Sequence, residues 1–270
     1  MQSTFICPCF RRAFGWCIPI GGLGGLVGLG GGEFRLPVLM HSIGFAARSA
    51  VPLNLMVSFI TLSFALVARS SSVSLWALQP HAAEIVGLAF GGVVSAFYGV
   101  GMVKKLSSAN LVRIIALLLF GLGGLLLMEA AFPFHGLDLL PDSGTARLLV
   151  GIGIGFGIGL VSSILGVAGG ELLIPTLLFL FNADIKTAGS ASIIISLVIV
   201  ATGLWRYWQM DAIPRGRGVQ RIVSAMGAGS IIGAALGGLA VAYAPVEALK
   251  LLLGMVLLAA AIKTVIGHRP

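Results

Sequence analysis

Two carboxylates and one guanidinium lie within otherwise uncharged, apolar stretches of this sequence. Glu33 directly follows the glycines at 30–32, Arg35 comes two residues later, and Glu171 directly follows the glycines at 169–170. An ionisable side chain in an apolar span is costly, so it is by default a candidate for binding an ion or carrying a proton. The two glycine runs are therefore the first places to look for chemistry.

The sequence leaves several interpretations of these residues open. A carboxylate near the start of a helix can cap that helix, because it interacts with free N–H groups and with the helix dipole. Alternatively, Glu33 and Glu171 carry a proton whose binding is coupled to that of another ion. Glu33 also has the option of an ion pair with Arg35, which in turn either attracts an anion or neutralises Glu33.

The two glycine runs belong to a duplicated motif. A shift of 138 residues places GLGGGEFRLP (28–37) on GVAGGELLIP (166–175). The register continues beyond the motif, since Asn54 falls on Ser192 and Ser58 falls on Ser196. The chain therefore consists of two halves of common origin, with the motif at the same place in each.

Each motif lies in an apolar run that is too long for one membrane crossing. The runs cover residues 14–45 and 147–182, whereas a crossing takes about 20 residues. Glycines followed by Pro37 or Pro175 interrupt a helix, so both runs are predicted to be broken helices or re-entrant hairpins. The unpaired N–H groups that begin the second part, together with the positive end of its dipole, suit a small anion.

The composition indicates an integral membrane protein. Of 270 residues, 58% are hydrophobic and 10% are charged, and the mean hydropathy is +1.07. An average soluble domain carries about 25% charged residues, so a soluble globular protein and a disordered chain are both excluded. The net charge of +8 does not indicate a nucleic-acid partner, because Lys and Arg fall at segment ends. No metal site and no cofactor are predicted.

We predict an all-α membrane protein of two inverted repeats, each with a broken hairpin and three spanning helices. A cytoplasmic segment (1–13) precedes repeat 1 (14–131), which holds the hairpin 14–45 and helices at 50–68, 83–103 and 111–131. An extracytoplasmic linker (132–146) leads to repeat 2 (147–266), which holds the hairpin 147–182 and helices at 188–205, 222–242 and 246–266.

The distribution of positive charge predicts the inversion. If each hairpin returns to its own side or crosses twice, each repeat has an odd number of crossings. The loops at Arg48, 104–113 and 206–221 then share one side with both termini, and that side carries most of the Lys and Arg residues. By the positive-inside rule this side is cytoplasmic, and the protein is a multi-pass protein of the cell membrane. A plain eight-helix arrangement places the basic loops 104–113 and 206–221 on opposite sides of the membrane, and the positive-inside rule rejects it.

Inverted repeats with broken helices are the architecture of secondary transporters, whose substrate lies near the membrane midplane where the repeats meet. The two glycine runs should therefore meet at the centre, with polar side chains nearby as further donors. The predicted substrate-binding residues are Gly30, Gly31, Gly32, Arg35, Asn54, Ala168, Gly169, Gly170, Ser190 and Ser192, and the proton-coupling candidates are Glu33 and Glu171. Hydrogen bonding between helices is the alternative role for Asn54 and the serines.

The duplicated motif resembles that of the sulfite exporter TauE/SafE family of membrane anion transporters. That family carries a glycine-rich G-x-G-G-G stretch and a following proline once in each half, and the resemblance covers residues 14–267. It implies a sulfite, sulfonate or other organosulfur oxyanion as substrate. This sequence departs from the family pattern at Glu33 and Glu171, where many members are apolar, and at Ala168, which replaces a glycine.

The leading hypothesis is a permease for a small anion, with the lipid bilayer as its surroundings and a homodimer as a candidate assembly. An anion channel of the same fold is the first alternative, although a channel has no need of titratable residues at the midplane. A membrane enzyme is the second alternative, and the sequence offers no catalytic constellation for it.

Overall fold

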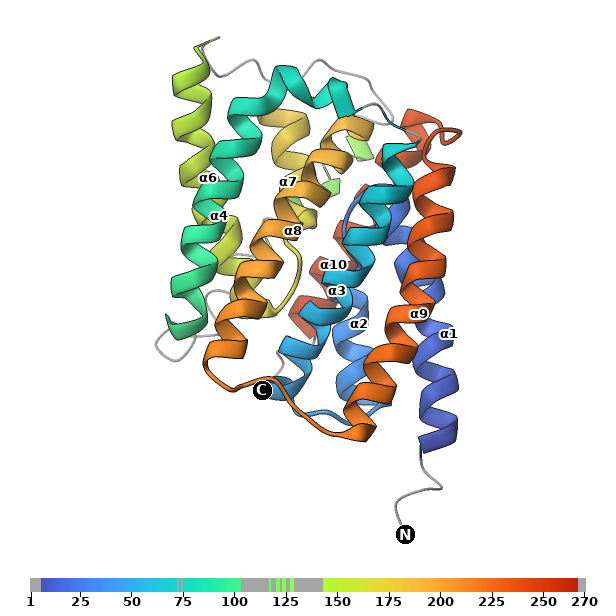
Figure 1. Cartoon of the computed structure of the whole chain (residues 1–270). Coiled ribbons are helices and arrows are strands. Elements are labelled where there is room, and N and C mark those ends of the chain that lie inside the picture. The colour runs from blue at the N-terminus through green and yellow to red at the C-terminus, as the bar shows by residue number, and fades with distance from the viewer. Residues whose placement is uncertain are drawn as a thin grey trace.

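The chain folds into long helices joined by short turns (Figure 1). The structure is a computed structural model, which describes residues 6–71, 73, 75–102, 117, 120–121, 123–124, 127–128 and 143–266. The long helices are α1 (Ile6–Val27), α3 (Ala47–Ser70), α4 (Ala82–Met102), α6 (Gly144–Leu165), α8 (Ile185–Gln209), α9 (Arg217–Ala240) and α10 (Val246–Ile266). Among these described residues, five segments are long and apolar enough to cross a membrane: Ser49–Ser70, Trp76–Gly99, Gly144–Ser163, Ile185–Gln209 and Arg217–Ala240. The prediction of an all-helical membrane protein is confirmed.

Part of the predicted organisation lies outside the described residues. This holds for residues 1–5, for most of the helix expected at 111–131 and for most of the linker expected at 132–146. The division into two repeats therefore stays a prediction.

Both long apolar runs are interrupted at the glycine motifs. After α1 the chain continues into the short helix α2 (Gly32–Pro37) and one π-helical turn, η1 (Val38–Ser42). After α6 it continues in the same way into α7 (Gly170–Pro175) and η3 (Thr176–Leu180). A shift of 138 residues places the three elements of the first run, α1, α2 and η1, on α6, α7 and η3 of the second. We call residues 28–32 the first tip and residues 166–170 the second tip.

Glycine is needed at the breaks because the backbone there enters the left-handed region. Gly28 and Gly31 have φ angles of 101° and 68°, and their counterparts Gly166 and Gly169 have φ angles of 66° and 78°. Residues with a Cβ rarely adopt these angles. Position 168 is not among the positive-φ positions, so an alanine is tolerated there.

Six of the long helices named above, all except α10, fall into two groups that run in opposite directions. Gly21 and Gly25 of α1 face Ser230 and Ala234 of α9, so these two helices are parallel. Helix α3 is also parallel to α9, because Ile60 faces Gly227 and Ala68 faces Gly238. Since α1 and α3 run the same way, the first hairpin begins and ends at the same end of the bundle (Figure 1).

Helices α4, α6 and α8 form the opposite group. Helix α6 is parallel to α4, because Gly151 and Gly155 face Gly87 and Leu88 in increasing order. Helix α8 is antiparallel to α3, because Arg69 binds Lys186 at one end while Leu55 faces Gly203 at the other. Helices related by the shift of 138 residues therefore run in opposite directions.

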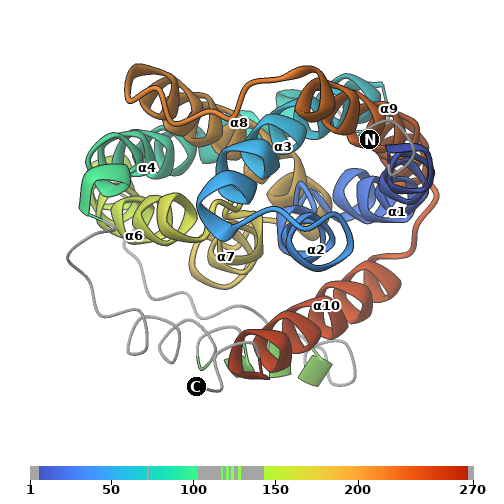
Figure 2. The ribbon, with the colours of Figure 1, turned by 90° about the horizontal axis from the view of Figure 1, so that it is seen from below.

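Seen from below, α2 and α7 lie inside the bundle between α1 and α6, and α10 lies along one face of it (Figure 2). Two short stretches of backbone, rather than side chains of a spanning helix, thus reach the interior. This arrangement positions the candidate site.

Candidate functional site

The two tips meet each other inside the bundle. A Cβ placed on Gly30 would lie 3.1 Å from Cβ of Ala168, and one on Gly32 would lie 3.2 Å from Cγ1 of Val167. On the other tip, a Cβ on Gly170 would lie 2.9 Å from Cα of Leu29. Two segments 138 residues apart therefore pack backbone against backbone, and Ala168 fills the space next to Gly30.

Each tip accepts a hydrogen bond from the helix that follows the other tip: α3 binds the second tip, and α8 binds the first tip. Asn54 of α3 donates from Nδ2 to the carbonyl oxygen of Gly166 at 2.8 Å and to that of Gly32 at 3.0 Å. Ser192 of α8 donates from Oγ to the carbonyl oxygen of Gly28 at 3.2 Å. Asn54 and Ser192 are equivalent positions, as are Gly28 and Gly166, so the two halves bind each other reciprocally.

Arg35 has no exposed surface and lies beneath the first tip. Its Nη2 donates to the carbonyl oxygen of Gly30 and to Oγ of Ser58, the latter at 2.8 Å. Its Nη1 donates to the hydroxyl of Thr61 and to Oγ of Ser230, the latter at 3.2 Å. The guanidinium thus joins the first tip, α3 and α9 through neutral oxygen atoms.

The two glutamates have different surroundings. Glu33 is half-buried, and its charge acts on the guanidinium of Arg35. Glu171 is buried, with 8% of its surface exposed, and the position equivalent to Arg35 is the buried Leu173. Its Oε1 accepts no hydrogen bond from the residues that the structure describes, so a hydrogen-bonded cap through that oxygen is not observed.

Several buried polar atoms near the tips have no hydrogen-bond partner within the described part of the chain. They are Arg35 Nε, Asn54 Oδ1, Glu171 Oε1 and Ser196 Oγ. A buried polar group without a partner costs about 1–3 kcal/mol, so it calls for an explanation such as a bound ion or water. The set contains both a donor and acceptors, which is the capacity to bind a small polar ligand.

Of the predicted site residues, the structure brings together the six tip residues, Arg35, Asn54 and Ser192. Ser190 has other contacts: its Oγ accepts from Arg69 Nε at 3.1 Å and donates to the carbonyl oxygen of Lys186 at 3.0 Å. Sequence reasoning missed Arg69, which is as deeply buried as Arg35. It ends a spanning segment, where an arginine is ordinarily at the membrane surface, so the sequence held no signal for its burial.

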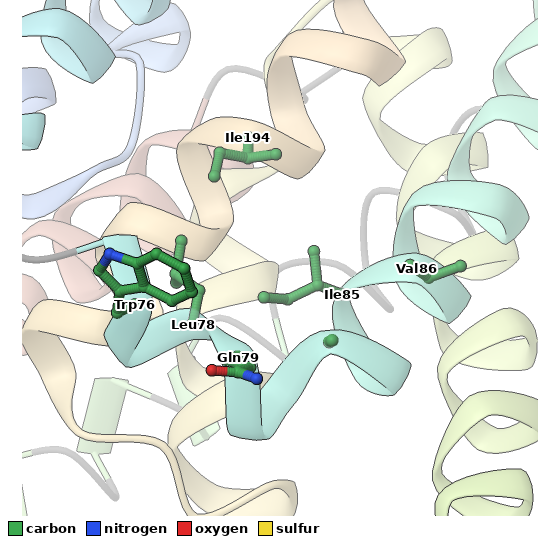
Figure 3. A pocket seen from close by; sticks show the side chains of 7 residues that line it. Trp76, Leu78, Gln79, Ile85, Val86 and Ile194 are labelled. Atoms are coloured by element: carbon green, nitrogen blue, oxygen red, sulfur yellow. The ribbon is translucent and has the colours of Figure 1, made fainter.

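A groove of about 550 Å³ opens at the bundle surface between α8 and the start of α4 (Figure 3). Its lining is apolar apart from one amide and contains no charged side chain: Trp76, Leu78, Gln79, Ala82, Ile85, Val86 and Ile194. It therefore does not suit an anion.

The fold and the paired tips define a class: a multi-pass helical membrane protein with two broken helices that meet in its interior. Residues 151–270 match the model of the family described as Sulfite exporter TauE/SafE. This stretch, a little under half of the chain, is therefore similar to that family. Searches of curated proteins and of solved structures find no match.

Proposed function

We propose that this protein is a permease that binds a small oxyanion, such as sulfite or a sulfonate, between its two tips. The observation that carries the proposal is the contact between Gly30 and Ala168, with a buried arginine directly beneath it. The tips present backbone N–H groups at the starts of α2 and α7, and the positive ends of two helix dipoles face the same region. Arg35 adds a full positive charge.

Movement of the tips is part of this proposal. Because Gly30 and Ala168 are in contact, an anion enters between them only when the two hairpins separate. Asn54 would then exchange its bonds to the carbonyl oxygens of Gly32 and Gly166 for bonds to the substrate. Exchange of one set of hydrogen bonds for another keeps the cost of opening small. A channel would not require this exchange, which favours a carrier.

We further propose that Glu33 or Glu171 binds the proton that accompanies the anion. A carboxylate beside a bound anion repels it, and protonation removes that repulsion. Proton and anion binding then favour each other, which is the linkage that a coupled carrier requires. Glu171 is the better supported of the two, because it is buried and its Oε1 accepts no hydrogen bond from the described residues.

The proposal is tested by measuring flux into proteoliposomes that contain the purified protein. The panel consists of sulfite, sulfate, thiosulfate, taurine, sulfoacetate and short carboxylates, each with and without a pH gradient. We expect saturable flux of a sulfur oxyanion that the pH gradient drives. Saturable flux of carboxylates alone would keep the permease and overturn the substrate class, whereas no flux of any anion would contradict the function.

A further inference from the structure

Arg69, near the C-terminal end of α3, makes bonds to both halves of the protein. Its side chain is buried, with 1% of its surface exposed. Nη1 donates to the carbonyl oxygens of Gly25 at 3.1 Å and Leu26 at 2.9 Å. Nη2 donates to the carbonyl oxygen of Lys186 at 2.8 Å, and Nε donates to Ser190 Oγ at 3.1 Å. We call these five residues the Arg69 cluster.

The cluster fixes the chain just before the first tip. Gly25 and Leu26 lie in the last turn of α1, whose carbonyl groups lack partners within the helix. A cation at this end of a helix satisfies these carbonyls and interacts favourably with the dipole. Since α1 ends at Val27, one residue before the break, Arg69 holds the point from which the first tip departs.

The guanidinium of Arg69 also packs where α1 and α8 lie against each other. A Cβ placed on Gly189 would lie 2.5 Å from the carbonyl oxygen of Val27 and 2.8 Å from Arg69 Nη2. There is thus no free space between the two helices at this end of the bundle. Separation of α1 from α8 here would break the bonds of Arg69 to one of them.

The position equivalent to Arg69 near the other end of the bundle does not carry an arginine. A shift of 138 residues places Arg69 on Tyr207, which carries neither a positive charge nor a fork of N–H donors. Hydrogen bonds that involve a charged group contribute more than neutral ones. The two equivalent positions therefore differ in the strength of the interactions that they can make.

We propose that Arg69 is a positioning residue that holds the first tip and keeps the path closed at the end where α3 ends and α8 begins. This inference rests on the proposed function, because it assumes that the tips are reached alternately from the two ends. Opening at the Arg69 end then requires loss of the charge-assisted bonds, whereas opening at the Tyr207 end does not. The protein without substrate consequently favours the state that is closed at Arg69.

Site-directed labelling tests this directly. Two reporter cysteines are placed separately, at Val27 beside the Arg69 cluster and at Val51 beside Gly166, after replacement of Cys7, Cys9 and Cys17. Their rates of reaction with a small maleimide are measured without substrate. We expect Arg69→Gln to raise the rate at Val27→Cys at least about tenfold, since it removes four bonds made by a charged group and one such bond contributes about 1.5–3 kcal/mol, and to leave Val51→Cys unchanged or slower. Ser190→Ala removes the bond from Arg69 Nε and the bond that Ser190 donates to Lys186, but it keeps the three bonds of Arg69 to carbonyl oxygens, so it should raise the rate at Val27→Cys by a smaller factor.

Two matched variants serve as controls. Tyr207→Phe alters the position equivalent to Arg69. Arg147→Gln removes an ion pair between Arg147 Nη1 and the buried Glu84 Oε1 (3.0 Å), which does not involve the tips. Neither should change the rate at Val27→Cys. An equal rise at both reporters with Arg69→Gln, or no rise at Val27→Cys with either Arg69→Gln or Ser190→Ala, would overturn the role of Arg69.

The labelling result and the transport result can fail separately. If the protein moves none of the anions but Arg69→Gln raises labelling at Val27→Cys alone, Arg69 keeps its role and the substrate proposal is wrong. If sulfite is transported but labelling does not respond, the permease stands and the role of Arg69 is overturned.

Discussion

Arg35 places a positive charge at a position with no exposed surface, and its hydrogen bonds go to hydroxyl and carbonyl oxygens. Neutral acceptors satisfy the N–H groups without cancelling the charge, and Glu33 compensates it in part through an electrostatic interaction. Nε has no hydrogen-bond partner within the described part of the chain. At the residue scale, the candidate site is therefore a buried cation with a donor left for a ligand.

Substitution at Arg35 should separate charge from hydrogen bonding. Arg35→Gln removes the charge, and we expect the Kd for sulfite to rise by about tenfold or more, since a hydrogen bond to a charged group contributes about 1.5–3 kcal/mol. Arg35→Lys keeps the charge and should lose less affinity. Isothermal titration with purified protein measures both. Equal affinity of wild type and Arg35→Gln would remove Arg35 from the site.

Substitution of the glutamates tests proton coupling. Glutamine mimics the protonated carboxyl group and keeps its size, so Glu171→Gln or Glu33→Gln should lose the pH dependence of flux and net accumulation while anion exchange persists. If the glutamate only stabilises the start of a helix, its replacement by glutamine should instead lower the thermal stability and leave the pH profile intact. Wild-type pH dependence in both variants would exclude the proton role.

At the scale of elements, the two breaks and their meeting inside the bundle were predictable, whereas the individual hydrogen bonds around them were not. Glycine runs followed by proline mark the interruptions because the backbone at Gly28 and Gly166 needs positive φ angles. The bond from Asn54 to Gly166 joins residues 112 positions apart, and a single sequence gives no distance between them. Arg69 was missed because burial at a helix end depends on how neighbouring helices pack.

Close packing of α4 against α6 gives a matched pair of variants two residues apart. A Cβ on Gly155 would lie 2.3 Å from the carbonyl oxygen of Leu88, whereas one on Gly153 would meet nothing within 4 Å. Gly155→Leu should therefore destabilise the fold by about 1–3 kcal/mol or more, and Gly153→Leu should not. Heating followed by size-exclusion chromatography in detergent compares the two. Equal losses of folded protein would contradict the observed packing of these helices.

At the scale of the whole molecule, the two antiparallel groups of helices begin at opposite ends of the bundle. Ser143 precedes α6 and Arg215 precedes α9, and these helices run in opposite directions. The sequence predicted inverted repeats from the distribution of Lys and Arg, because the cost of moving positive charge across a membrane acts on the loops. The side that faces the cytoplasm is a prediction from that charge distribution.

Labelling of intact cells tests this orientation. Ser143 and Arg215 are both exposed, so a cysteine at either position should react where the reagent reaches it. An impermeant maleimide should label Ser143→Cys in intact cells and Arg215→Cys only after permeabilisation. Labelling of both from outside would contradict antiparallel repeats, and the reverse pattern would invert the predicted orientation.

If the anion passes between the two tips, a larger side chain at position 168 should block it. Ala168 is buried against Gly30 and has no positive φ angle, so a larger side chain there acts on the space between the tips. Positions 31 and 169 are less suitable, because a Cβ on Gly31 would meet Ile20 of its own hairpin at 2.7 Å.

The decisive measurement is sulfite flux into proteoliposomes with equal amounts of folded wild type, Ala168→Val and Ala168→Gly. We expect Ala168→Val to lose at least about tenfold in flux, since overpacking between the tips costs about 1–3 kcal/mol, and Ala168→Gly to keep the wild-type flux. Wild-type flux through folded Ala168→Val would contradict passage of the anion between the tips.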